Sequence, residues 1–158
     1  MIHRIVKDNK IELLFGTGDR NYEKIMNTIA EKGIALSDNV KIVPYIDNMA
    51  ECMAAADVVV SRAGAITVSE IAALGKPSIL IPSPYVTENH QYHNAMALVE
   101  NGAAEILEEK DLTPESLTER VNALLKNRNK LSEIGKCAKE MAVLDATERI
   151  YQTLCEIV

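Results

Sequence analysis

The sequence has 158 residues, 47% of them hydrophobic and 25% charged, which is typical of a globular chain with one core, and we predict a single domain over residues 1–158. A formal net charge of −6, no tryptophan and only one phenylalanine argue against a surface that binds nucleic acid. No apolar run approaches the roughly 18 residues that span a bilayer, so we expect any membrane contact to be peripheral.

Short apolar runs alternate with helix-like segments up to about residue 107, which is the pattern of a parallel α/β sheet. We predict strands at residues 11–15, 40–44, 57–60, 78–81 and 104–107. We predict helices between them at residues 21–32, 48–55, 65–74 and 88–101. The predicted fold class is α/β, a Rossmann-like parallel sheet with helices on both faces.

After residue 110 the pattern becomes purely helical, which predicts a helical C-terminal tail. Thr113 followed by Pro114 is typical of a helix N-cap with proline in the first helical position. We predict helices at residues 114–126, 129–142 and 145–157, and we expect the lysines and glutamates of residues 105–140 to form solvated helix faces. The three cysteines are widely spaced and odd in number, which favours free thiols over disulfides or a zinc site: Cys52, Cys137 and Cys155.

The start of the sequence resembles the tail of a helix, over Met1–Asn9, that leads into the first predicted strand. This suggests that a first strand and its following turn are absent, and in nucleotide-binding sheets that turn commonly holds phosphate. Neither a G-x-G-x-x-G motif nor a P-loop occurs, and the glycine pair of Gly16-Thr17-Gly18 is a weak phosphate signal by itself.

The most informative segment is 61–70, where a β-branched strand leads through small residues into a helix. The turn Gly64-Ala65 lets main-chain N–H groups approach an anion, and the helix dipole favours negative charge at that end. Arg62 either approaches a phosphate or caps a neighbouring helix. Thr67 is either a helix N-cap or a phosphate ligand, and Glu70 either accepts hydrogen bonds from sugar hydroxyls or is an exposed carboxylate near a helix start.

Four loops follow predicted strands, and in an open parallel sheet such loops converge on one crevice: 16–18, 45–49, 61–65 and 82–91. The last of these ends in polar residues, and His90, Gln91 and Asn94 offer hydrogen-bonding groups suited to sugar hydroxyls. His90 could instead be a general base, but no serine or cysteine nucleophile is evidently paired with it. A metal site on His90 with His93 or Glu88 is the least favoured interpretation.

Taken together, residues 45–49, 56–65 and 67–70, with His90-Gln91 and Asn94-Ala95, resemble the C-terminal domain of the MurG family. That family moves N-acetylglucosamine from its UDP carrier onto lipid I, giving lipid II for peptidoglycan. Asp145–Ile150 is similar to the family's last helix, so the resemblance runs from about Ile11 to the C-terminus. It implies the C-terminal half of a GT-B glycosyltransferase, in which this domain binds most of the donor without a metal or other cofactor.

The resemblance also implies a role for each matching residue. Ile46 would contact uracil through its main chain, and Met49 would line the same pocket. Ile66 and Thr67 would lie at the diphosphate, and Glu70 would accept from the ribose hydroxyls. His90 and Gln91 would face the N-acetylglucosamine hydroxyls. The predicted substrate-binding set is completed by Arg62, Gly64, Ala65 and Asn94.

The family's N-terminal domain, with its acceptor loops and proposed histidine base, is absent from this sequence, as is its Gly-Gly-Ser turn. We therefore assign no catalytic residue and expect the chain alone to be inactive. The implied partners are UDP-N-acetylglucosamine and, through the missing domain, an undecaprenyl-linked acceptor, at the cytoplasmic face of the cell membrane. An unpaired sheet edge could also drive self-association.

Two other functions stay open at this point. A non-catalytic partner subunit of a two-chain N-acetylglucosaminyltransferase would contain a similar domain. An enzyme similar to UDP-N-acetylglucosamine 2-epimerase would share the architecture, but it would need further catalytic carboxylates and a histidine that are not convincingly placed here.

Overall fold

A computed structural model describes residues 11–157, so the expected helix tail Met1–Asn9 lies outside the described residues. The contacts divide the chain into two compact units. The first unit holds the chain up to Ala55 together with Thr113–Ala123, and the second holds Ala56–Leu112 with the chain from Leu124 onward. The single domain over residues 1–158 therefore stays a prediction. Each unit is described by itself.

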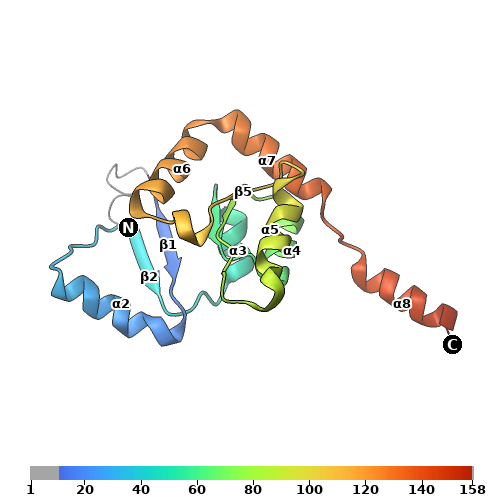
Figure 1. The fold of residues 1–158 in the computed structure, drawn as a ribbon, viewed down its shortest axis with the longest axis horizontal. Helices are drawn as coiled ribbons and strands as arrows, with labels where there is room; N and C mark the ends of the chain where they lie inside the picture. Colours follow the sequence, from blue (N-terminus) through green and yellow to red (C-terminus); the bar gives the residue numbers. More distant parts are fainter. Residues whose placement is uncertain (1–10, 158) are drawn as a thin grey trace. The chain divides into compact units, whose positions relative to one another are not determined.

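The first unit contains two parallel strands and their helices (Figure 1). Strands β1 and β2 pair in register from Leu13 opposite Val40 to Gly16 opposite Val43. Helix α6 begins with a reciprocal cap, because Thr113 Oγ1 accepts from the Ser116 N–H at 3.0 Å and Ser116 Oγ accepts from the Thr113 N–H at 2.9 Å. The elements are β1 (Leu13–Gly16), α2 (Asp19–Glu31), β2 (Val40–Val43), α3 (Met49–Ala55) and most of α6 (Pro114–Lys126).

The second unit contains a three-stranded parallel sheet in the order β3-β4-β5. Val59 pairs with Ser78, and Leu80 pairs with Ile106. The elements are β3 (Val59–Ser61), α4 (Ala65–Leu74), β4 (Ser78–Leu80), η1 (Thr87–Asn89), α5 (His90–Val99), β5 (Glu105–Ile106), η2 (Glu109–Asp111), α7 (Arg128–Glu140) and α8 (Ala146–Ile157).

The core of the second unit lies around its central strand. Every residue of β4 is buried, which is typical of a parallel strand covered on both faces. Ile79 and Leu80 are fully buried, as are Ile71 of α4 and Ala95 of α5. Burial of each large aliphatic side chain contributes about 1.5–3 kcal/mol, so this cluster fixes α4 and α5 against the sheet that carries the strand ends.

Helices α4 and α7 approach each other closely at two glycines. Gly75 ends α4 in the left-handed conformation with φ of 62°, which favours glycine. A Cβ on Gly135 of α7 would lie 2.6 Å from the carbonyl oxygen of Gly75. Lys139 Nζ, one helical turn further along α7, donates to the carbonyl of Ala73. The contact therefore requires a residue without a side chain at position 135.

The predicted α/β class is confirmed, and most predicted elements match the observed ones to within two residues. Among the described residues the strands form two parallel sheets, β1-β2 and β3-β4-β5. Helix α5 begins at His90, not at Glu88, because Glu88 and Asn89 have φ of 53° and 52°, which an α-helix cannot contain. All three cysteines are free.

Helix α8 differs from the other helices in its burial. Each of its described residues is exposed, including Ile150, Tyr151 and Leu154. Over residues 11–157, none of the helices is long and apolar enough to cross a membrane.

Candidate functional site

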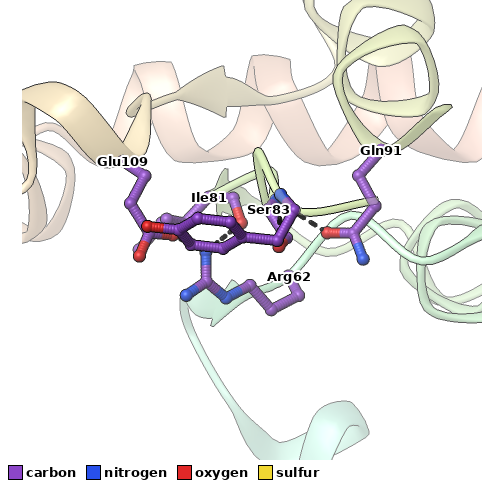
Figure 2. Close-up of polar contacts among 6 residues, drawn as sticks. Arg62, Ile81, Ser83, Gln91 and Glu109 are labelled. Carbon is purple, nitrogen blue, oxygen red and sulfur yellow. Dashed lines mark hydrogen bonds and ion pairs between the residues drawn. The ribbon is translucent and has the colours of Figure 1, made fainter. Parts of the chain in front are cut away.

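The three strands of the second unit are parallel, so their carboxyl ends meet at one edge of the sheet. Segments 62–64, 81–86 and 107–111 begin at that edge. Hydrogen bonds join them to one another and to α5. Arg62 contacts both Ile81 and Glu109, and Gln91 contacts Ser83 (Figure 2). Asn94 of α5 contacts Ala63. These bonds join the segment after β3 to the end of β4 and to α5, and the convergence of the four predicted loops on one crevice stays a prediction.

Helix α4 begins at this edge with an open N-terminus. Its N-cap is Gly64, which offers no side chain, and no side-chain hydrogen bond caps the helix. None of the described residues accepts a hydrogen bond from the N–H groups of Ala65, Ile66 or Thr67. These N–H groups and the helix dipole together favour an anion. One of the two roles considered for Thr67 is wrong, because the N-cap lies three residues earlier, at Gly64.

Arg62 directly follows β3, and its guanidinium is held by two partners. Its Nη1 donates to the Ile81 carbonyl at 3.3 Å and forms an ion pair with the Glu109 carboxylate. The hydrogen bond from Arg62 holds the pKa of the Glu109 carboxyl below its ordinary value. Arg62 therefore does not cap a helix among the described residues, and its contact with phosphate stays a prediction.

The expectation of solvated helix faces over 105–140 is wrong for Glu109, because this carboxylate is paired with Arg62 and its side chain is only 31% exposed. Lys130 also pairs with Glu105, across the chain from α7 to β5. The first of these pairs lies at the strand edge that carries the candidate site.

Gln91 and Asn94 lie on α5, three residues apart, so both side chains occupy one face of the helix. Gln91 Oε1 accepts from the Ser83 N–H at 2.9 Å, which leaves its two amide N–H groups free to donate to a ligand. Asn94 Nδ2 donates to the Ala63 carbonyl at 3.0 Å, and Ala63 is fully buried. Asn94 thereby fixes the turn that leads into α4.

His90 is the first residue of α5 and is exposed. Its Nδ1 lies 2.9 Å from the Thr87 carbonyl oxygen, so the neutral ring donates there and keeps Nε2 as an acceptor. His93 is exposed, as expected for a surface residue. Within residues 11–157, no group of three or more histidine, cysteine, aspartate or glutamate residues could hold a metal ion.

Ile66 and Glu70 are four residues apart, which places them on one face of α4. Ile66 is 77% exposed although it is a large apolar residue, and Glu70 is also exposed. An exposed isoleucine beside an open helix N-terminus offers an apolar surface to a ligand that binds there.

The remaining predicted site residues, Ile46 and Met49, belong to the first unit. The Ile46 side chain packs against the end of β1, where a Cβ on Gly16 would lie 3.2 Å from its Cδ1. No described residue forms a hydrogen bond with the Ile46 main chain. Met49 begins α3 and is 41% exposed. Whether these residues join the others in one crevice stays a prediction.

Sequence reasoning missed Glu109, Ser83 and Ile81. Ligands of parallel sheets bind at the carboxyl ends of the strands, and this holds for β5 as for the other strands. Glu109 lies three residues after Ile106, the last residue of β5. The short length of β5 hid this signal.

The parallel sheet, its flanking helices and the cluster of polar groups at the strand ends define a Rossmann-like α/β domain. The family model described as "Glycosyltransferase family 28 C-terminal domain" matches residues 3–150. The chain belongs to this family, and the resemblance to the MurG family is confirmed.

Curated relatives carry the name "UDP-N-acetylglucosamine--N-acetylmuramyl-(pentapeptide) pyrophosphoryl-undecaprenol N-acetylglucosamine transferase". The protein from Acetivibrio thermocellus is 53% identical over 157 residues, which is 99% of this chain and 42% of the relative. The protein from Bacillus cytotoxicus is 47% identical over 146 residues, 92% of this chain and 40% of the relative. The chain therefore spans about two-fifths of the length of these relatives.

Two solved structures have the same fold. The crystal structure of MurG from Acinetobacter baumannii is similar with a TM-score of 0.80 and 29% identity, covering 98% of this chain and 44% of that one. Glycosyltransferase VinC, solved in complex with DTDP, has a TM-score of 0.68 and 21% identity, covering 98% of this chain and 36% of that one. The second likeness shows the fold alone.

Proposed function

We propose that this chain is the UDP-N-acetylglucosamine-binding part of the transferase that adds N-acetylglucosamine to lipid I and so makes lipid II for peptidoglycan. The names of the relatives support this proposal. The structural observation that carries it is the open N-terminus of α4, with the N–H groups of Ala65–Thr67 unpaired among the described residues, beside Arg62. An anionic diphosphate fits such a place better than a neutral ligand does.

The diphosphate is expected to lie on the first turn of α4. The N–H groups of Ile66 and Thr67 would donate to it, and the Thr67 hydroxyl can add a further hydrogen bond. Because Gly64 has no side chain, the ligand can approach the main chain closely. A free guanidinium edge of Arg62 would supply a positive charge.

The nucleoside is expected to extend from this turn. Glu70 lies one and a half turns into α4, where its exposed carboxylate can accept hydrogen bonds from both ribose hydroxyls. The contact of uracil with the Ile46 main chain, beside Met49, is expected from the resemblance to the MurG family alone.

The sugar is expected to meet α5. Gln91 has donors free, and His90 keeps Nε2 as an acceptor, so together they can bind hydroxyls of both polarities. Asn94 would act on the sugar through its remaining oxygen, Oδ1, since its nitrogen is held by Ala63.

The reaction proposed is an inverting displacement, in which a hydroxyl of the acceptor sugar attacks the anomeric carbon and the bond to the diphosphate breaks. Negative charge then grows on the leaving diphosphate, and the α4 dipole stabilises it more strongly as the bond breaks. We expect the acceptor, an undecaprenyl-linked sugar, to be bound by the rest of the enzyme at the cytoplasmic face of the membrane. Binding, not turnover, is therefore the appropriate test of this chain.

Isothermal titration calorimetry of the 158-residue chain with UDP-N-acetylglucosamine, UDP and CDP tests the proposal. We expect both uridine ligands to bind more tightly than CDP, and Glu70→Ala to weaken both by about tenfold, the effect of losing a charge-assisted hydrogen bond. Glu133→Ala removes an exposed carboxylate of α7 and should change nothing. Equal binding of CDP, or unchanged binding by Glu70→Ala, would count against the proposed recognition of uracil or of ribose.

A further inference from the structure

The Arg62 guanidinium has its positive charge partly neutralised from within the chain. Its Nη1 faces both the Ile81 carbonyl and the Glu109 carboxylate, and these contacts leave Nη2 and Nε uncommitted (Figure 2). The arginine side chain is 50% exposed, so a ligand can reach its remaining edge. A guanidinium has five N–H donors and can therefore serve two anions at once, or exchange one for another.

The Glu109 main chain is fixed at the strand edge. The N–H of Leu107 donates to the Leu80 carbonyl at 2.9 Å, and Leu107 is 2% exposed. Glu109 begins η2 two residues later, and the N–H of Asp111 closes this turn on Glu108 at 3.0 Å. The carboxylate is thus held where the chain leaves the sheet, on the side from which Arg62 and α4 also emerge.

A fixed carboxylate at this position opposes the binding of a second anion. Arg62 lies two residues before Gly64, the N-cap of α4, so the ion pair and the open helix N-terminus are neighbours in the chain. An anion on α4 gains from the positive charge of Arg62 and loses from the negative charge of Glu109. A diphosphate carries more charge than a carboxylate and also accepts hydrogen bonds from the helix N–H groups, so it can displace Glu109 from Arg62. The affinity of the site for the diphosphate is then lower than it would be without the Glu109 carboxylate.

We propose that Glu109 competes with the donor's diphosphate for Arg62, and so limits the affinity of this site for the donor and for the UDP product. Glu109 is in this sense a positioning residue that acts through Arg62. The inference rests on the proposed function, in that it takes the diphosphate of a UDP-sugar as the anion.

Calorimetry of the 158-residue chain and its Glu109→Gln variant, with UDP, uridine and inorganic pyrophosphate, tests the inference. Glutamine keeps the size of the side chain and can still accept from Arg62, but removes the charge. We expect UDP and pyrophosphate to bind about fivefold more tightly, the effect of one unit charge a few ångströms away in water. Uridine, which has no phosphate, should bind unchanged, and the gain for UDP should shrink as salt is added.

Two variants separate competition from a change in net charge. Glu108→Gln removes a carboxylate one residue away that is paired with Lys110 at 3.1 Å, and it should give a clearly smaller gain. In an Arg62→Gln background, Glu109→Gln should give a clearly smaller gain than in the wild-type chain, because only the direct repulsion between the carboxylate and the phosphate remains. An equal gain from Glu108→Gln, an equal gain from Glu109→Gln with and without Arg62, or weaker UDP binding by Glu109→Gln would each overturn the inference.

The pyrophosphate arm separates this inference from the proposed function. If pyrophosphate binding strengthens in Glu109→Gln while UDP and uridine do not bind at all, the proposed function fails, and the competition for Arg62 stands for a simple diphosphate and not for the donor. If UDP binds the wild-type chain and Glu109→Gln leaves it unchanged, the proposed function stands and the competition fails. If neither phosphate ligand binds the wild-type chain, both are wrong.

Discussion

The side-chain oxygen of Gln91 accepts a hydrogen bond from the main-chain N–H of Ser83 at 2.9 Å, which ties the first turn of α5 to the segment that follows β4. This bond determines which end of the amide is available. The oxygen is committed to the protein, and the NH₂ group remains for a ligand. Gln91 is therefore oriented as a donor to sugar oxygens before any ligand arrives.

Replacement of Gln91 by glutamate tests this orientation. Gln91→Glu keeps an oxygen for the Ser83 N–H but removes both amide donors, so we expect UDP-N-acetylglucosamine to bind about tenfold more weakly, while UDP, which lacks the sugar, binds nearly as before. Calorimetry with both ligands measures the two affinities. Gln152→Glu makes the same chemical change on exposed α8 and serves as the control. Equal losses for both ligands would argue against a contact between Gln91 and the sugar.

Asn94→Ala is expected to destabilise the second unit. It leaves the carbonyl of Ala63, a fully buried residue, without its donor, and loss of such a partner costs about 1–3 kcal/mol. Urea denaturation monitored by circular dichroism gives the free energy of unfolding. Asn101→Ala removes an exposed bond of the same type, from Asn101 Nδ2 to the Ala97 carbonyl, and should cost much less. Similar costs for the two variants would mean that Asn94 does not hold the turn.

Gly135→Ala should also destabilise the fold, although alanine in a helix interior is normally more stable than glycine by about 1 kcal/mol. The added Cβ would lie 2.6 Å from the Gly75 carbonyl oxygen, so α4 and α7 must move apart, and overpacking of this kind costs about 1–3 kcal/mol. The midpoint of thermal unfolding measures the effect, and Ser132→Ala on the exposed face of α7 is the control. An increase in stability on Gly135→Ala would show that the helices are not in contact there.

The pKa of Glu109 offers a test of the ion pair without any ligand. Arg62 lowers this pKa in the folded state, so the pair contributes stability that is present above the ordinary pKa of glutamate and is lost as pH falls through the lowered value. Arg62→Gln should raise the Glu109 pKa towards its ordinary value in an NMR titration of side-chain carboxyl carbons. Asp145, whose pKa Arg149 lowers in the same way, should titrate unchanged in that variant. A Glu109 pKa that does not respond to Arg62→Gln would contradict the pairing.

Capping residues, glycines and apolar patterns predicted most of the elements, because each of these features depends on the conformation of the residues next to it in the chain. Thr113 and Ser116 form the expected cap, and the string from Ala65 to Leu74 is helical over the predicted bounds, with Gly75 ending it. The predicted helix 88–101 begins two residues before α5 and ends two residues after it. The early start arises because the left-handed conformations of Glu88 and Asn89 depend on the surrounding loop, and glutamate gives no sign of such a conformation.

The site was only partly predictable for a related reason. The open N-terminus of α4 could be inferred, since a strand, a turn and a helix follow one another directly in the sequence. The pairing of Arg62 with Glu109 joins residues far apart in the chain, and the parallel pairing of β3 with β4 and of β4 with β5 brings them together. Similarly, nothing local to Gln91 indicates that its partner is the N–H of Ser83.

The central claim is that α4 binds the diphosphate of a UDP-sugar through its first N–H groups. A titration of the ¹⁵N-labelled 158-residue chain with UDP-N-acetylglucosamine, followed by ¹H–¹⁵N correlation spectra, tests it most directly. We predict that the amide signals of Ile66 and Thr67 shift the most and saturate together, since new hydrogen bonds form at these two groups. Spectra in which these two signals stay in place while the ligand binds, or in which no signal shifts at millimolar ligand, would contradict the account.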